Sequence, residues 1–121
     1  MRVETLSYIS DLLKSLDVPY SFMEWKGKVP GTYFVGEYQE VEALSEDGMQ
    51  ESLFILTGFT RDSFLSLEKY KETIENKIER TAILDSGSSV AIFYGHAFPV
   101  PGSASIKKLQ INLTVKEWKV K

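Results

Sequence analysis

The sequence contains no cysteine, and histidine occurs once among its 121 residues. Without thiols the chain forms no disulfide, no thiolate zinc site and no cysteine nucleophile. A single histidine also lacks the spaced partner ligands of a histidine metal site. These absences exclude several enzyme classes and fit a reducing compartment. We therefore expect neither a metal nor another cofactor.

Long apolar runs and an excess of positive charge are missing as well. No stretch approaches the roughly 18 uninterrupted apolar residues of a membrane-spanning helix, so we expect no membrane partner. The N-terminal segment mixes acids into its apolar pattern and has no small-residue cleavage site, which argues against a signal peptide and favours synthesis in a cytoplasm. A formal net charge of −3 argues against a protein that holds nucleic acid by its phosphates.

The length fits one domain, residues 1–121, with two amphipathic helices. Apolar residues recur at three- and four-residue spacing between Val3 and Leu16, which predicts a helix that ends before Pro19. The same spacing from Phe64 to Ile78 predicts a second helix, capped by Asp62 or Ser63.

The remaining segments have the patterns of strands. Residues 32–44 and 50–60 are rich in β-branched and aromatic residues, and the turn between them includes Gly48, which predicts a long hairpin. The last segment alternates, with its apolar side formed by Leu109, Ile111, Leu113 and Val115. The order of these elements predicts an α+β domain: a mainly antiparallel sheet with both helices packed on one face and a long hairpin extending from the core.

The string "AILDSGSS" around Asp85 resembles the catalytic loop of aspartic proteases, in which two aspartates share a proton. Retroviral-type members carry one such loop per chain and act as dimers. The flap and the second glycine signature that follow this loop in that family are not recognisable here. Because aspartate and glycine are also typical of tight turns, the sequence favours a hairpin turn, with a dimeric aspartic hydrolase that uses Asp85 as a remote alternative.

The single histidine, His96, lies in "FYGHAFPVPG" without a nucleophile motif to accompany it. We expect it to be structural or to lie at a protein contact. Pro99 and Pro101 predict that the strand ends there and is followed by a loop. Phe98 and Val100 then lie either at a subunit contact or over the domain's own core.

Two charge clusters are interpreted as surface features. The acidic cluster lacks the spacing of a calcium loop, and it predicts a solvated strand face and hairpin tip. Its members are Glu37, Glu40, Glu42, Glu46 and Asp47. The basic cluster lies on the last strand, where lysine discourages stray edge pairing. Its members are Lys107, Lys108, Lys116, Lys119 and Lys121.

Residues 18–75 and 82–120 together resemble small structural proteins of long-tailed phages and prophages of Gram-positive bacteria. The likeness is to the tail-terminator, or tail-to-head joining, group. It covers nearly the whole chain and rests on overall sequence and element order rather than on a chemical motif. Members are α+β domains without catalytic residues that assemble as a hexameric ring on the end of the tail tube.

The resemblance implies a non-enzymatic virion protein at the head–tail interface, made in the host cytoplasm. Its partners would be its own copies, the major tail tube protein and the head-completion or connector protein, with DNA passing through the ring without specific binding. An acidic lumen lining would fit Glu40 and Glu42. The expected protein-contact residues are Glu46, Asp47, Gly48, Met49, His96, Phe98 and Val100. A head-completion or minor capsid role remains the alternative.

Overall fold

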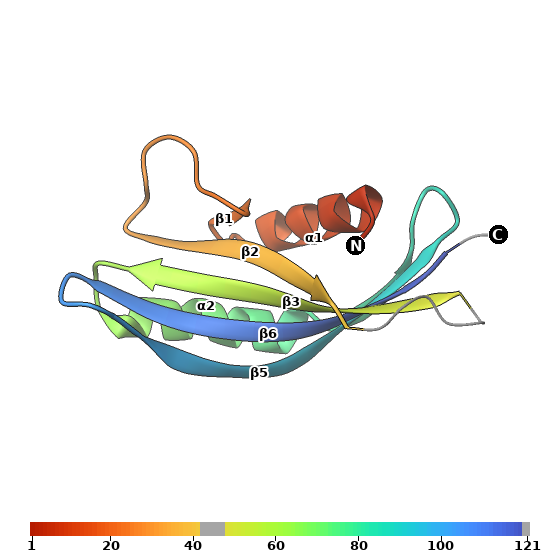
Figure 1. Ribbon diagram of the computed structural model, residues 1–121. Coiled ribbons are helices and arrows are strands. Elements are labelled where there is room, and N and C mark those ends of the chain that lie inside the picture. The colour runs from red at the N-terminus through yellow and green to blue at the C-terminus, as the bar shows by residue number, and fades with distance from the viewer. Residues whose placement is uncertain (42–47, 120–121) are drawn as a thin grey trace.

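The computed structural model describes residues 1–41 and 48–119 of the chain. This part contains two helices and one curled six-stranded sheet (Figure 1). In chain order the elements are α1 (Val3–Ser15), β1 (Tyr20–Phe22), β2 (Thr32–Glu40), β3 (Met49–Thr60), α2 (Phe64–Lys77), β4 (Arg80–Ile83), β5 (Ser89–Ser103) and β6 (Ile106–Trp118).

The strands lie in the order β1-β2-β3-β6-β5-β4, and every pairing is antiparallel except that of β1 with β2. The predicted α+β class is therefore confirmed. The last strand, β6, lies in the middle of the sheet, between β3 and β5. The interpretation of Lys107, Lys108 and Lys116 as protection of a sheet edge is wrong, because both sides of β6 are paired. Lys119 follows the end of β6, and Lys121 lies outside the described residues.

One face of the sheet forms the hydrophobic core with the two helices. Ile9 and Leu13 from α1 and Leu67 and Ile74 from α2 are fully buried in a single cluster with the sheet. The predicted alternation of β6 is confirmed. Its core-facing residues Leu109, Ile111, Leu113 and Val115 are at most 1% exposed.

Local capping explains where the helices begin and end. The Ser63 side chain accepts a hydrogen bond from the backbone N–H of Leu65, which confirms one of the two predicted caps of α2. At the end of α1, Asp17 adopts a positive φ of 60°, and the N–H of Val18 donates to the carbonyl of Leu13. The chain therefore leaves α1 just before Pro19, as predicted.

The predicted hairpin is formed by β2 and β3, which pair from Thr32 opposite Thr60 to Glu40 opposite Ser52. Gly48 has a φ of +82°, as its place in the turn predicted. Beyond Ser52, the first residues of β3 pair with β6, so this end of the hairpin is held by a third strand. Glu42, Glu46 and Asp47 lie outside the described residues.

The prediction that Pro99 and Pro101 end a strand is wrong, because β5 continues through both prolines to Ser103. The backbone N–H of Tyr94 donates to the Glu79 carboxylate at 3.1 Å, so it points away from β6. N–H directions alternate along a strand, and the extra residue of the bulge between Tyr94 and His96 shifts this alternation by one, so the nitrogen of Pro99 faces the same free edge. Pro101 lies within a second register shift, between Val100 and Ser103, and has no partner residue on β6. A proline there removes no hydrogen bond to β6.

Gly58 of β3 leaves the space that two core side chains fill. A Cβ atom at this position would lie 2.5 Å from Phe34 Cε2 and 2.8 Å from Leu67 Cδ2. We expect Gly58→Ala to lower the free energy of unfolding by about 1–3 kcal/mol, because overpacking forces the core apart. Chemical denaturation measures this change. Thr57→Ala, one residue away on the other face of the sheet, is the control, and an equal effect of the two variants would contradict the packing shown here.

Candidate functional site

The helix-free side of the sheet is the largest candidate contact surface, and we call it the open face. It consists of the outward-facing side chains of β2, β3, β6 and β5, which alternate with the core residues. Most of its members on β2, β3 and β5 are apolar or aromatic. These residues are Tyr33, Val35, Leu53, Ile55, Phe59, Phe93, Phe98 and Val100.

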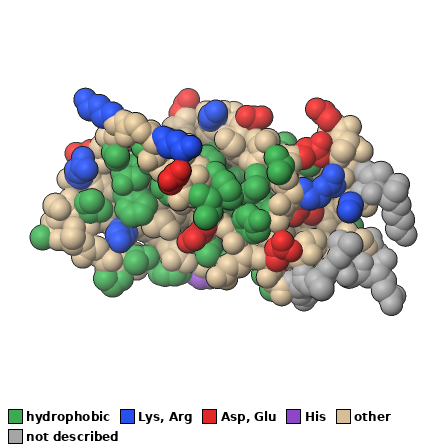
Figure 2. Space-filling view, turned by 45° about the horizontal axis from the view of Figure 1, so that its top comes forward, with side chains coloured by type: hydrophobic (Ala, Val, Ile, Leu, Met, Phe, Trp, Pro, Cys, Tyr) green, Lys and Arg blue, Asp and Glu red, His purple; other side chains and the backbone are tan. Residues whose placement is uncertain are grey.

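The apolar character of the open face is unusual for a sheet side without a second layer. On β3 the outward side chains of Leu53, Ile55 and Phe59 are half-buried although no helix covers them. Phe93 is 42% exposed and Phe98 is 39% exposed. Figure 2 views this side obliquely and shows hydrophobic side chains gathered there with charged groups between them. Apolar surface of this kind marks contact sites on proteins.

His96 lies on the open face as part of a short polar chain. Gln110 Nε2 donates to Asn112 Oδ1 at 2.9 Å, and Asn112 Nδ2 lies 3.2 Å from His96 Nε2. The imidazole also stacks on Phe98, with ring centroids 5.6 Å apart. His96 is thus oriented by an amide and a phenyl ring, which suits a structural or contact residue, as the sequence predicted, better than a general base.

Two lysines of β6 lie over aromatic rings of the open face. Lys108 Nζ is 5.6 Å from the centroid of Phe59, and Lys116 Nζ is 5.7 Å from the centroid of Phe93. Their alkyl stems extend the apolar surface, and each ammonium group is attracted to the face of the ring beneath it. The face therefore combines apolar area with fixed charges.

Phe98 and Val100 were expected either over the core or at a subunit contact. Both side chains lie outside the core cluster, on the open face opposite Gln110 and Lys108. The first of these two readings is therefore wrong.

Asp85 lies at the exposed turn between β4 and β5. The N–H of Gly87 donates to the carbonyl of Leu84 at 2.8 Å, which closes this turn. Ser86, the next residue, donates from its hydroxyl and its N–H to the Glu4 carboxylate at 2.7 and 3.2 Å. The aspartate therefore has the position that the turn interpretation predicts.

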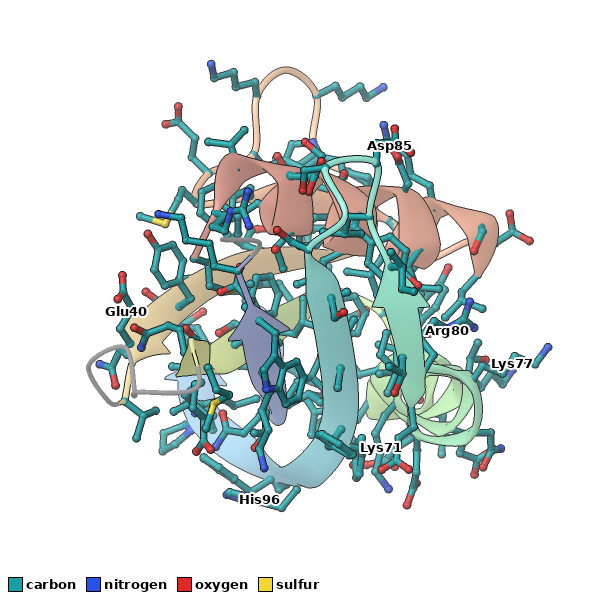
Figure 3. The ribbon with its side chains drawn as sticks, turned by 90° about the vertical axis from the view of Figure 1, so that its right-hand side faces the viewer. Glu40, Lys71, Lys77, Arg80, Asp85 and His96 are labelled. Atoms are coloured by element: carbon teal, nitrogen blue, oxygen red, sulfur yellow. The ribbon has the colours of Figure 1, made fainter. Side chains whose placement is uncertain are left out.

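The sequence candidates do not converge on one site. In Figure 3, Asp85, His96 and Glu40 lie on three separate sides of the molecule. Glu40 ends β2, and its carboxylate is 3.4 Å from the N-terminal amino group. Gly48 and Met49 lie where β3 begins, and the Gly48 carbonyl accepts from the Lys119 N–H at 3.3 Å. Of the described candidates, His96, Phe98 and Val100 lie together on the open face.

A buried carboxylate on β6, Glu117, was missed by the sequence analysis. It is 4% exposed, and its Oε2 accepts hydrogen bonds from the Thr5 hydroxyl at 2.6 Å and the Arg2 N–H at 3.2 Å. Arg2 occupies the N-cap position of α1 and provides no side-chain cap. Glu117, on β6, takes the place of that cap, and its negative charge is favourable at the positive N-terminal end of the helix. The absence of Ser, Thr, Asp or Asn just before Val3 was the available signal.

A cavity of about 290 Å³ lies beside this cap, between the two ends of the chain. Its lining carries charges of both signs: acidic Glu40 and Glu117, basic Arg2 and Lys119, and the amino group of Met1, which is 3.4 Å from the Glu40 carboxylate. In residues 1–41 and 48–119 no three His, Asp or Glu side chains gather as metal ligands. No described helix is long and apolar enough to cross a membrane.

Among residues 1–41 and 48–119, three titrating groups have clearly shifted pKa values. Burial raises the pKa of the Tyr20 phenol, and burial together with Glu75 raises the pKa of Tyr94. The Glu75 carboxylate, 3.5 Å away, raises the pKa of Lys71. Each shift moves the group further from neutral pH. These three groups therefore stay protonated and are not tuned for acid–base chemistry at neutral pH.

Comparison with known proteins leaves the family open. No protein-family model matches this sequence, and no curated protein matches it.

The turn geometry predicts that Asp85→Asn leaves the protein unchanged, because asparagine serves the same turn. We expect a change in the free energy of unfolding within about 0.5 kcal/mol. Thermal melting tests this. Peptide cleavage by the unaltered protein at mildly acidic pH, abolished by Asp85→Asn, would contradict it and favour the dimeric hydrolase.

The cap predicts coupled losses of stability at two positions. Glu117→Gln removes the charge from a buried acceptor, and Thr5→Val removes one of its donors. Each should lower the free energy of unfolding by about 1–3 kcal/mol. In a double-mutant cycle the combined loss should be smaller than the sum. Chemical denaturation at neutral pH measures all three variants. Exposed Glu72→Gln on α2 is the control, and an effect of Glu117→Gln no larger than this control would show that the cap contributes nothing.

Proposed function

We propose that this chain is a structural subunit of the phage tail-terminator type. In this proposal its copies form a ring, hexameric as in the group it resembles, on the end of the tail tube. The ring stops growth of the tube and presents a surface to the head connector, while DNA passes through without specific binding. The protein performs no catalysis and acts in the virion at the head–tail interface.

The observation that carries the proposal is the open face. A helix-free sheet surface with half-buried Leu53, Ile55 and Phe59 and exposed Phe93 and Phe98 suits contact with another protein. The charges on this face are mixed, so it lacks the basic excess of a nucleic-acid surface. His96, Phe98 and Val100 belong to this face, and they are the contact residues that we propose.

The proline-containing half of β5 also supports a defined contact rather than open-ended strand pairing. Pro99 and Pro101 place no donor at the free edge of the sheet, which discourages addition of a further strand there. Contact through side chains of the open face is then favoured over contact through the strand edge. For the acidic lumen lining, Glu40 is the described candidate, and its side chain is 54% exposed.

The test uses purified tail tubes from a phage that lacks its terminator. We expect the unaltered protein to appear by electron microscopy as a ring at the tube end. Phe98→Ser should keep the fold, because Phe98 lies outside the core, yet weaken tube binding at least about tenfold, a loss typical of a central contact residue.

Leu65→Ser is the matched control, because Leu65 is 66% exposed on α2, away from the open face. Equal binding by both variants would overturn the role of the open face. Binding to purified head connectors but not to tubes would favour the alternative, a head-completion protein. Binding to neither would overturn the proposal as a whole.

A further inference from the structure

The apolar side chains of the open face have no second layer of the same chain over them. We infer that a second copy of the chain covers them in the free protein. The two copies pack open face to open face about a two-fold axis that runs parallel to β3 and β6. This proposal concerns the protein in solution, before assembly, and does not depend on the proposed function.

The register of the sheet places charges so that such a pair is self-complementary. Glu51 on β3 lies directly beside Lys116 on β6. A two-fold axis that runs between these strands, parallel to both, sets β3 of one copy over β6 of the other at the same level. Glu51 of each copy then faces Lys116 of the other, so the contact contains this ion pair twice.

The next strands on either side, β2 and β5, complement each other in the same way. Glu37 on β2 and His96 on β5 share one cross-strand row, through Ile55 and Asn112. The same axis sets β2 of one copy over β5 of the other, so that Glu37 faces His96. His96 Nε2 lies 3.2 Å from Asn112 Nδ2, so Nδ1 is the ring nitrogen that would meet the carboxylate of Glu37.

The apolar residues match under the same operation. In the next row Val35 of one copy faces Phe98 of the other, and in the row beyond it Tyr33 faces Val100. Two sheets that pack in this way lie about 10 Å apart with strands inclined by about 30°, the arrangement of a β-sandwich. Each copy thereby supplies the second layer that the other lacks.

The alternative axis, perpendicular to the strands, gives no such match. It sets β3 over β3 and β6 over β6 in opposite directions. If this axis passes through the middle of the face, Lys116 of one copy lies opposite Gln110 of the other, and Glu51 lies opposite Thr57. The acids and bases no longer face each other, so the charges select the parallel axis.

The experiment is sedimentation velocity of the purified chain over about 1 μM to 1 mM, a range that covers weak and moderate dimers. We expect reversible association to twice the chain mass of 13.7 kDa. Glu51→Lys alone and Lys116→Glu alone should each weaken the dimer at least about tenfold, because each change occurs twice in the contact. The variant that carries both changes should regain most of the affinity.

Lys69→Glu, an exposed charge reversal on α2, is the control and should leave the dimer unchanged. Thermal melting of every variant separates a folding defect from an association defect. The variant with both changes still has opposite charges at positions 51 and 116 within each chain, so it serves as a control for folding as well. The proposal is overturned if the chain stays monomeric over the whole concentration range. This holds also if the monomer binds an oligothymidylate through the open face, since nucleic acid would then be the occupant. A dimer whose affinity is unchanged by Glu51→Lys and by Lys116→Glu overturns the proposal as well. Tube binding is measured separately, so loss of the proposed function leaves this result interpretable.

Discussion

The pairing of β3 with β6 is the interaction on which the rest of the structure depends. It runs from Met49 opposite Trp118 to Thr60 opposite Lys107, and it sets the position of every other strand. On one side of this pair, Phe54, Leu56 and Ile111 pack in the core with the two helices. On the other side, Leu53 and Ile55 have no helix to pack against. The same two strands therefore create both the core of the domain and its candidate contact surface.

The consequences for function follow from the asymmetry between these two faces. The helices cover one face and bury the core that stabilises the single chain. Glu117 caps α1 and so connects this helix to β6, the central strand. The open face is then available to another protein, with its charges at fixed levels along the strands. Because the prolines of β5 remove donors from the free edge, the face itself is favoured over the edge as the route to assembly.

Much of the fold could be predicted from periodicity, because helical spacing and strict alternation report which side chains are buried. The two helices and the buried side of β6 were predicted in this way. The cap at Ser63 and the β2–β3 hairpin were predicted from residue type instead, because serine suits a helix N-cap and glycine a tight turn. Strand order could not be, since the central place of β6 depends on long-range pairing, and so its lysines were misread as edge residues. The prolines of β5 misled for a related reason: a proline ends a ladder only when its nitrogen faces the partner strand. The open face had a sequence signal in β3, where "LFILTGF" is apolar at successive positions instead of alternating.

The most direct test of this account is hydroxyl-radical footprinting of the protein, free and bound to purified tail tubes. The central claim is that the open face is the surface by which this protein assembles. It predicts that oxidation of Phe93 and Phe98 falls on binding, relative to the free protein at a dilution where it is monomeric, while oxidation of Leu65 on the far side of the helix layer stays the same. Unchanged oxidation of both phenylalanines with protection over α2 would contradict the account.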